Sequence, residues 1–234
     1  MVTALFLGCG LFWTTAYVLI IRVGLRDRSY GMPIVALAAN LAWEFIFSFV
    51  RPSAGVQQTV NIVWFLLDLG ILATVVRFWP REFPWLSRRT FLAGLAATIA
   101  LAYLGVNAVS LQFDHGQGFF AAFGQDLMMS GLFLGMLTAR RSLRGQSVAI
   151  AVCKLIGSAL AAAGTWLHER NVPVYHGDLL PYLYFATLLV NAAYVLALLA
   201  VKRAQPATPT RATAPAAERI PAGAPGAEVV GSSR

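Results

Sequence analysis

Apolar residues in this chain come in long runs, separated by short polar segments that hold most of the arginines. The runs cover residues 3–22, 33–50, 59–78, 91–112, 119–139, 147–167 and 180–201. A helix of about 20 apolar residues crosses the hydrocarbon core of a bilayer. Because lipid offers the backbone no hydrogen-bonding partner, each run should be helical. The pattern predicts an all-α, polytopic membrane protein with a seven-helix transmembrane domain over residues 1–203.

The basic residues of the connecting segments predict the orientation of this bundle. Twelve follow the first, third, fifth and seventh runs, whereas the remaining connections hold only Arg51 and Arg170. The twelve are Arg22, Arg26, Arg28, Arg77, Arg81, Arg88, Arg89, Arg140, Arg141, Arg144, Lys202 and Arg203. Basic residues concentrate in cytoplasmic loops, so the N-terminus is expected outside and the C-terminus in the cytoplasm. The net charge of +8 then indicates contact with membrane lipid headgroups and no nucleic-acid partner.

Amino-acid composition also favours a membrane protein. The chain is 58% hydrophobic and 12% charged, whereas soluble domains are about one-quarter charged. The first run has basic residues after it and none before it, the reverse of a cleavable signal peptide, and is expected to be retained. Residues 204–234 are rich in Ala, Pro, Gly, Ser and Thr, which predicts a disordered cytoplasmic tail. The high Arg, Ala and Gly content favours a bacterial cytoplasmic membrane as the location.

Four ionisable residues lie well away from the ends of the runs, where they are functional candidates because burying a charge in a membrane is costly. They are Glu44, Asp68, Asp126 and Lys154, and Asp178 comes just before the last run. Their spacing from the loops places the acids in the middle to outer half of the membrane. Two structural roles are alternatives to a chemical role for Lys154. Its side chain reaches toward the cytoplasmic face, or it neutralises Asp68. Asp126 is explained equally well by a hydrogen bond between helices.

Amides and aromatic rings recur at helical spacing beside these acids. Asn40, Trp43, Glu44 and Phe47 share one helix face, for example, and Trp64 lies four residues before Asp68. Taken singly, such rings are more often packing residues than ligand contacts. As a set they predict an interior binding site. The expected binding residues are Asn40, Trp43, Phe47, Trp64, Tyr103, Asn107, Phe133, Tyr184, Asn191 and Tyr194.

Several familiar catalytic motifs are absent from the sequence. It contains no phosphate-binding glycine loop, no HExxH zinc motif and no GxSxG nucleophile elbow. The aspartate-rich motifs of soluble terpene synthases are missing as well. The three histidines lack metal-ligand spacing, and both cysteines fall inside apolar runs, as packing residues do. Any chemistry is therefore expected to use isolated carboxyl groups and aromatic walls, without metal or cofactor.

Several sequence blocks resemble the integral membrane terpene cyclases of meroterpenoid and indole-diterpene pathways, the paxilline- and pyripyropene-type cyclases. The most specific block runs from Ser29-Tyr30-Gly31-Met32-Pro33 to Asn40-Leu41-Ala42-Trp43-Glu44-Phe45, followed by Trp64-Phe65-Leu66-Leu67-Asp68. Weaker support comes from Gly124-Gln125-Asp126-Leu127-Met128-Met129-Ser130, Arg144-Gly145-Gln146-Ser147 and Lys154-Leu155-Ile156-Gly157. The order and spacing of these blocks hold over roughly residues 29–195.

The resemblance implies a seven-span enzyme that protonates a terminal alkene or epoxide of a prenyl chain, farnesyl above all, linked to an aromatic group. It implies that Glu44 belongs to the acid machinery. The family has a second carboxylate near its last span, where this chain has Asn191, with Asp178 as the acid nearby. The fungal members carry an amide at the position of Asp126. The resemblance therefore suggests that the second carboxylate has moved from the seventh span to the fifth.

Elementary physics agrees with that role for Glu44. Desolvation by Trp43, Phe45 and Phe47 favours the neutral carboxyl, which is the form that donates a proton. Ring faces would stabilise the resulting carbocation and exclude water. A small seven-helix transporter or proton-coupled carrier, with the acids and Lys154 as a relay, remains the alternative. A receptor-like sensor is a weaker third reading.

Overall fold

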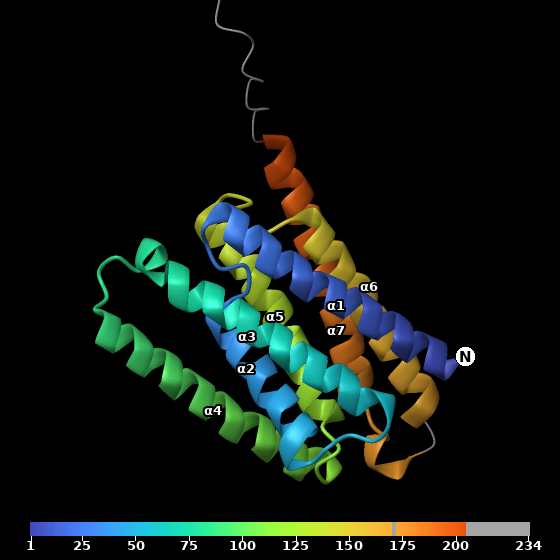
Figure 1. Cartoon of the computed structure of the whole chain (residues 1–234). Coiled ribbons are helices and arrows are strands. Elements are labelled where there is room, and N and C mark those ends of the chain that lie inside the picture. Colours follow the sequence, from blue (N-terminus) through green and yellow to red (C-terminus); the bar gives the residue numbers. More distant parts are fainter. Residues whose placement is uncertain (170–171, 205–234) are drawn as a thin grey trace, which may run out of the picture. The chain divides into compact units, whose positions relative to one another are not determined.

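The computed structural model describes residues 1–169 and 172–204, and these form a bundle of seven helices in which no strand occurs. The helices run alternately up and down the bundle (Figure 1). They are α1 (Val2–Asp27), α2 (Ile34–Phe45) with its π-helical continuation η1 (Ile46–Val50), α3 (Val56–Glu82), α4 (Arg88–Asp114), α5 (Phe119–Arg140), α6 (Val148–Glu169) and α7 (Leu179–Ala204), with a short 3-10 helix η2 (Pro173–Tyr175) before α7.

The all-helical fold predicted from the apolar runs is confirmed, and every run coincides with one helix. Within the described part of the chain, six helices are long and apolar enough to cross a membrane. The seventh, residues 34–50, is apolar but shorter, at the lower end of the length that spans a bilayer. Which face of the membrane each terminus occupies stays a prediction from the arginines. The tail predicted to be disordered lies outside the described residues.

Helix α2 lies inside the bundle and is its most enclosed element. It packs against α3, α4 and α5, while α1 packs mainly against α6, and α5 against α7. The backbones of the consecutive helices α3 and α4 stay apart, although Trp79 and Phe91 stack near their connecting loop with ring centroids 4.6 Å apart. Eight of the twelve α2 residues are buried, Asn40 and Glu44 among them. A short helix surrounded by neighbours on most sides is suited to hold polar groups away from lipid, because those neighbours can supply partners.

The π-helix η1 begins two residues after Glu44. Its wide turn changes the hydrogen-bond pattern of the backbone, and the Phe47 carbonyl accepts from residues outside the helix: Asn61 Nδ2, on α3, donates to it at 3.3 Å. Ser53 N donates to the same oxygen at 2.9 Å. π-bulges of this kind are frequent at functional sites. Asn61 precedes Trp64 by three residues, just as Asn40 precedes Trp43. Its role in the structure is to support the backbone of η1.

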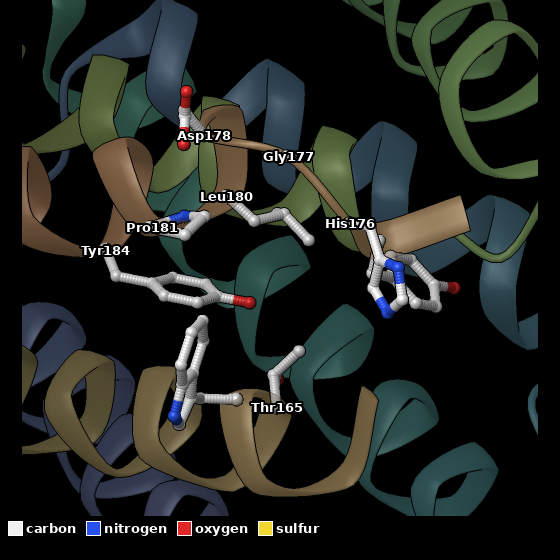
Figure 2. Close-up of a pocket in the computed structure, with 9 residues that line it drawn as sticks. Thr165, His176, Gly177, Asp178, Leu180, Pro181 and Tyr184 are labelled. Carbon is white, nitrogen blue, oxygen red and sulfur yellow. The ribbon is translucent and has the colours of Figure 1, made fainter. Parts of the chain in front are cut away.

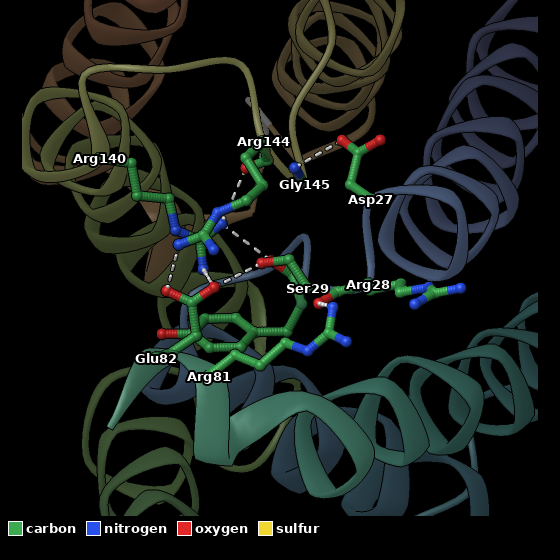
Figure 3. A network of polar contacts seen from close by, with 9 residues as sticks. Asp27, Arg28, Ser29, Arg81, Glu82, Arg140, Arg144 and Gly145 are labelled. Atoms are coloured by element: carbon green, nitrogen blue, oxygen red, sulfur yellow. Dashed lines mark hydrogen bonds and ion pairs between the residues drawn. The ribbon is translucent and has the colours of Figure 1, made fainter. Parts of the chain in front are cut away.

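At the arginine-rich end of the bundle, three loops are tied together by one buried carboxylate (Figure 3). Glu82 accepts from Ser29 Oγ at 2.7 Å and from Arg144 Nη2 at 2.9 Å. Arg140 lies 3.6 Å from the same carboxylate and donates to the Tyr30 carbonyl at 2.9 Å. Burial raises the pKa of the Tyr30 hydroxyl, and the positive charge of Arg140 partly offsets this. Basic residues expected only to orient the protein therefore also join its loops.

Two glycines allow the α1–α2 loop and the α5–α6 loop to touch. Gly145 has φ +75°, and a Cβ there would lie 2.6 Å from the Tyr30 carbonyl oxygen. A Cβ on Gly31 would lie 2.7 Å from the Gly145 carbonyl oxygen. Asp27 accepts from the Gly145 N–H at 2.9 Å and holds the contact in place. The two sequence blocks that contain these glycines are thus structurally one unit.

Candidate active site

Two carboxyl groups, those of Glu44 on α2 and Asp68 on α3, meet inside the bundle. Glu44 is 2% exposed and Asp68 is 0% exposed. Tyr17 Oη, from α1, donates to Glu44 Oε1 at 3.0 Å and accepts a short hydrogen bond from Asn40 Nδ2. Gln125 Nε2, from α5, donates to Asn40 Oδ1 at 3.4 Å. Residues from four helices therefore form this group. We call Glu44 and Asp68 the carboxyl pair.

Three oxygens of the carboxyl pair have no hydrogen-bond partner among the described residues. Asp68 adjoins both Glu44 and Asn40, but neither of its oxygens makes a hydrogen bond of regular geometry, and Glu44 Oε2 makes none either. No cation among the described residues is ion-paired with either acid. Two like charges cannot share a dry site without a large cost, so at least one of the two carboxyls is neutral. A buried, protonated acid beside an unsatisfied acceptor is equipped to donate a proton.

Lys154 forms a second polar cluster with α5 and α7. Its Nζ donates to Asp126 Oδ1 and Ser130 Oγ, both at 2.6 Å, and to Asn191 Oδ1 at 2.9 Å. Ser158 Oγ donates to Asp126 Oδ2 at 2.6 Å. With three acceptors, the ammonium group is fully satisfied. We call these residues the lysine cluster.

The lysine cluster corrects both sequence-based interpretations of Lys154. Its side chain is 1% exposed and so does not reach toward a membrane face, and its partner is Asp126 and not Asp68. Asp126 and Asn191 contact the same ammonium group. The suggested exchange of a carboxylate between the seventh and fifth spans is therefore geometrically consistent, because both positions face one place.

Helix α1 connects the two clusters. The ring of Trp13 lies 5.3 Å from Lys154 Nζ. It also packs edge-on against Tyr17, with 5.8 Å between ring centroids. One turn separates these two aromatic residues, so they share a helix face. Sequence reasoning missed both, although a tyrosine hydroxyl in the middle of an apolar run is a signal, since it needs a partner there.

A groove of about 660 Å³ opens to the outside of the bundle between α3 and α4, with α2 as its floor. Its walls are almost wholly apolar. They comprise Leu41, Ala42, Phe45, Phe65, Leu69, Leu72, Ala96, Ile99, Ala100, Tyr103 and Leu104. Phe65 and Leu72 lie three residues before and four after Asp68, and Leu41 lies three before Glu44. Glu44 and Asp68 thus lie within one turn of these wall residues along α2 and α3, although neither carboxyl lines the groove itself.

Asp178 lies elsewhere. It is exposed and belongs to a smaller pocket of about 280 Å³ between the end of α6 and the start of α7. Figure 2 shows this pocket with Tyr184, Thr165 and His176 around it and the Asp178 carboxyl at its edge. The structure therefore brings together two of the four predicted acids, places Asp126 in the lysine cluster and leaves Asp178 separate.

The predicted aromatic residues divide among several places. Trp64 lies beside the carboxyl pair, where its ring is 6.2 Å from that of Tyr17 and its Nε1 donates to Thr14 Oγ1 at 2.9 Å. Tyr103 lines the groove. Phe133 and Tyr194 pack together with centroids 5.6 Å apart, both almost fully buried. One aromatic chamber around Glu44, as the sequence suggested, is therefore not what these residues form.

Trp43 and Phe47 hold the turn between α4 and α5. Trp43 Nε1 donates to the Gly118 carbonyl at 3.1 Å. A Cβ on Gly118, whose φ is +88°, would lie 2.2 Å from the Phe47 ring. The Asp114 carboxylate accepts from Gly118 N and Phe120 N and starts α5. The remaining predicted residue, Asn107, accepts from Arg51 Nη1 at 2.7 Å.

Comparison with known proteins decides what this arrangement belongs to. The model of one family, the Pyr4-like transmembrane terpene cyclases, matches residues 1–204. The chain belongs to the Pyr4-like transmembrane terpene cyclases. It is 30% identical over 195 residues to the Pyr4-family terpene cyclase mfmH of Annulohypoxylon moriforme, covering 79% of this chain and 80% of that one. It is 32% identical over 177 residues to the terpene cyclase pyr4 of Aspergillus fumigatus, covering 70% and 69%.

A third relative, the terpene cyclase dpmaB of Metarhizium anisopliae, is 32% identical over 204 residues, 83% of either chain. No solved structure matches the sequence. These relatives confirm the resemblance and identify the protein as a membrane terpene cyclase, which they favour over the carrier. They are fungal, so the bacterial origin inferred from composition is not supported. Among the described residues of this cyclase, no three His, Cys, Asp or Glu side chains are grouped to hold a metal ion.

Proposed function

We propose that this cyclase starts its reaction with a proton from Glu44, delivered to the terminal alkene or epoxide of a prenyl chain linked to an aromatic group. The observation that carries the proposal is the buried pair of Glu44 and Asp68, which within the described part of the chain has no ion-paired cation and retains oxygens without partners. Ring closure then transfers the positive charge along the chain, and loss of a proton ends the reaction. The product is an isomer of the substrate, so no cofactor is consumed.

Tyr17 and Asn40 are positioning residues in this proposal. The Tyr17 hydroxyl donates to Oε1 of Glu44, which leaves Oε2 to carry the acidic proton. Asn40 fixes the orientation of that hydroxyl by donating to it. Asp68 beside them stabilises positive charge that develops near the pair. A carboxylate close to a cation in a site of low dielectric interacts with it strongly.

The prenyl chain lies in the groove between α3 and α4. The groove is apolar and open toward lipid, as its exposed wall residues Phe45, Leu69 and Leu104 show. A prenylated substrate dissolves in the bilayer and reaches this opening without crossing water. Tyr103, Phe65 and Phe45 supply ring faces there, which attract carbocations. Trp64 does the same from the side of the carboxyl pair.

The lysine cluster has a supporting role. Its charges are matched in a dry surrounding, where a paired Lys and Asp are stable only with additional hydrogen bonds, and these are present. It joins α5, α6 and α7, and Trp13 connects it with Tyr17. We assign Asp126 to this framework. Through Trp13 and Tyr17 the framework helps to hold Glu44 in position.

The test uses membranes that contain the full-length chain, incubated with a farnesylated aromatic compound and its terminal epoxide. The wild-type protein is expected to give a product of unchanged mass and shifted retention. Glu44→Gln keeps the shape of the side chain and removes the acid, so it is expected to fold and to lose cyclisation. Glu218→Gln, outside the region that matches the family, is the matched control. An active Glu44→Gln variant overturns the proposal.

A further inference from the structure

Arg51, directly after η1, lies at the end of the bundle opposite to most of the basic residues. It is one of two basic residues in the segments that face away from the arginine-rich end. Its guanidinium is largely enclosed: Nη1 donates to Asn107 Oδ1 at 2.7 Å, and the group lies over the Phe47 ring at 5.5 Å. A Cβ on Gly116 would lie 3.3 Å from Arg51 Cδ and Nε, so the backbone of the α4–α5 turn covers the stem.

The other two nitrogens of this guanidinium have no hydrogen-bond partner in the part of the chain that the structure describes. Nε and Nη2 are both inaccessible and make no hydrogen bond within residues 1–169 and 172–204. No described carboxylate forms an ion pair with Arg51. The nearby Asp114 is occupied by the two backbone N–H groups that start α5. The Nε–H and one Nη2–H bond point from the same edge of the planar guanidinium, and this edge is the fork that binds carboxylate or phosphate through two parallel hydrogen bonds.

A charged fork held in this way is costly unless something accepts from it. Asn107 fixes the guanidinium from one side, as a partner does when it orients a binding group. The residue one turn before Asn107 on α4 is Tyr103, which lines the groove. Arg51 itself follows Glu44 by seven residues, about 10 Å along a helix. The fork is therefore near one end of the groove, and the carboxyl pair is farther in.

We infer that Arg51 binds a carboxylate on the substrate's aromatic head group and so sets how far the prenyl chain extends toward Glu44. This inference rests on the proposed function and adds the chemistry of the other end of the substrate. Ser48 Oγ and Ser110 Oγ, both buried and without partners among the described residues, provide further donors on α2–η1 and α4. A phosphate of a bilayer lipid has the same chemistry and is the second source to test.

The experiment measures binding and turnover separately. The ligands are a farnesylated hydroxybenzoic acid and its methyl ester, with versions whose terminal alkene is reduced so that they bind without reacting. Full-length protein in a maltoside detergent is compared with Arg51→Gln and Arg51→Lys. Arg77→Gln, an exposed arginine at the opposite end of the bundle, is the matched control. Thermal unfolding of each variant shows whether it is folded.

The expected result is a 10- to 100-fold weaker affinity of Arg51→Gln for the acid, in the range of about one or two hydrogen bonds to a charged group. The ester binds wild-type and variant protein alike. Arg51→Lys retains the charge but loses the fork, so most of the affinity for the acid is lost there too. The KM for the acid rises with the affinity loss, while kcat changes less.

Three outcomes overturn the inference. One is an equal loss for acid and ester, which indicates a structural role for Arg51. Another is unchanged affinity for the acid in Arg51→Gln. The third is that a short-chain phosphatidylglycerol binds in an Arg51-dependent manner while the acid does not, which assigns the fork to lipid. Because the reduced analogues report binding alone, Arg51-dependent binding without any cyclisation refutes the proposed function and leaves the oxyanion site in place.

Discussion

The Tyr17 hydroxyl donates a hydrogen bond to Oε1 of Glu44 over 3.0 Å, although the two residues lie 27 positions apart in the sequence. The same hydroxyl accepts from Asn40. The acid is therefore held by α1 as well as by its own helix. In a site without bulk water, such preorganised contacts fix which oxygen faces the substrate.

Replacing Tyr17 by Phe is expected to lower kcat about five- to tenfold, the value of about one neutral hydrogen bond. KM should stay close to that of the wild type, because the substituted group does not contact the prenyl chain. Steady-state kinetics on the farnesylated substrate measures both. Tyr182→Phe, at an exposed position on α7, provides the comparison. A variant with unchanged kcat would show that Glu44 is positioned without the tyrosine.

Lys154→Met is expected to destabilise the protein by about 3–5 kcal/mol, because it leaves the buried Asp126 carboxylate unpaired. The double variant Lys154→Met, Asp126→Leu should recover much of this loss, since it removes both charges. Thermal unfolding in detergent of the wild type, both single variants and the double variant gives the coupling between the two residues. A double variant no more stable than Lys154→Met would contradict the interpretation of the lysine cluster as a matched pair.

Filling the groove should block the substrate without unfolding the protein. Ala100 lines the groove, and Ala97 on the same helix does not; both are exposed. Ala100→Trp is therefore expected to raise KM for the farnesylated substrate at least tenfold, whereas Ala97→Trp leaves it within about twofold, as surface substitutions do. Both variants should unfold at the wild-type temperature. If the two tryptophans have equal effects on KM, the prenyl chain does not lie between α3 and α4.

Gly145→Ala is expected to destabilise the arginine-rich end. The new Cβ would lie 2.6 Å from the Tyr30 carbonyl oxygen, at a φ of +75° that favours glycine. Gly135→Ala, inside α5 with no atom within 4 Å of a Cβ, should be neutral or slightly stabilising, because alanine favours helix more than glycine. Unfolding temperatures of the two variants test the difference. Equal stability would mean that the two loops separate at little cost.

The position of Glu44 illustrates how far sequence reasoning reached. The cost of a carboxyl in an apolar run singled it out, and its burial is as expected. The spacing of Trp43 and Phe47 on the same face also holds, but these rings pack on Gly118 and do not enclose the acid. Helical spacing fixes which residues share a face, whereas the neighbour that covers this face is a matter of packing between helices.

Lys154 shows the same limit for charges. Its place in a span made it a candidate, and the sequence offered Asp68 or the membrane face as its partner. Only the packing of α5, α6 and α7 decides that Asp126, Ser130 and Asn191 surround it. Arg51 is the converse case, because its charge was used to orient the protein and its enclosed fork appears only when Asn107 and Gly116 are brought beside it.

The sequence alone determined the number of helices, their approximate limits and the family, because the lipid requires long apolar runs and closed backbone hydrogen bonds whatever the neighbours are. The tertiary structure decided which polar groups meet: Tyr17 with Glu44, Lys154 with Asp126, and a groove where α3 and α4 diverge. These contacts join residues far apart in the chain. Their partners depend on how helices pack side by side, and a pattern read along one helix does not contain that information.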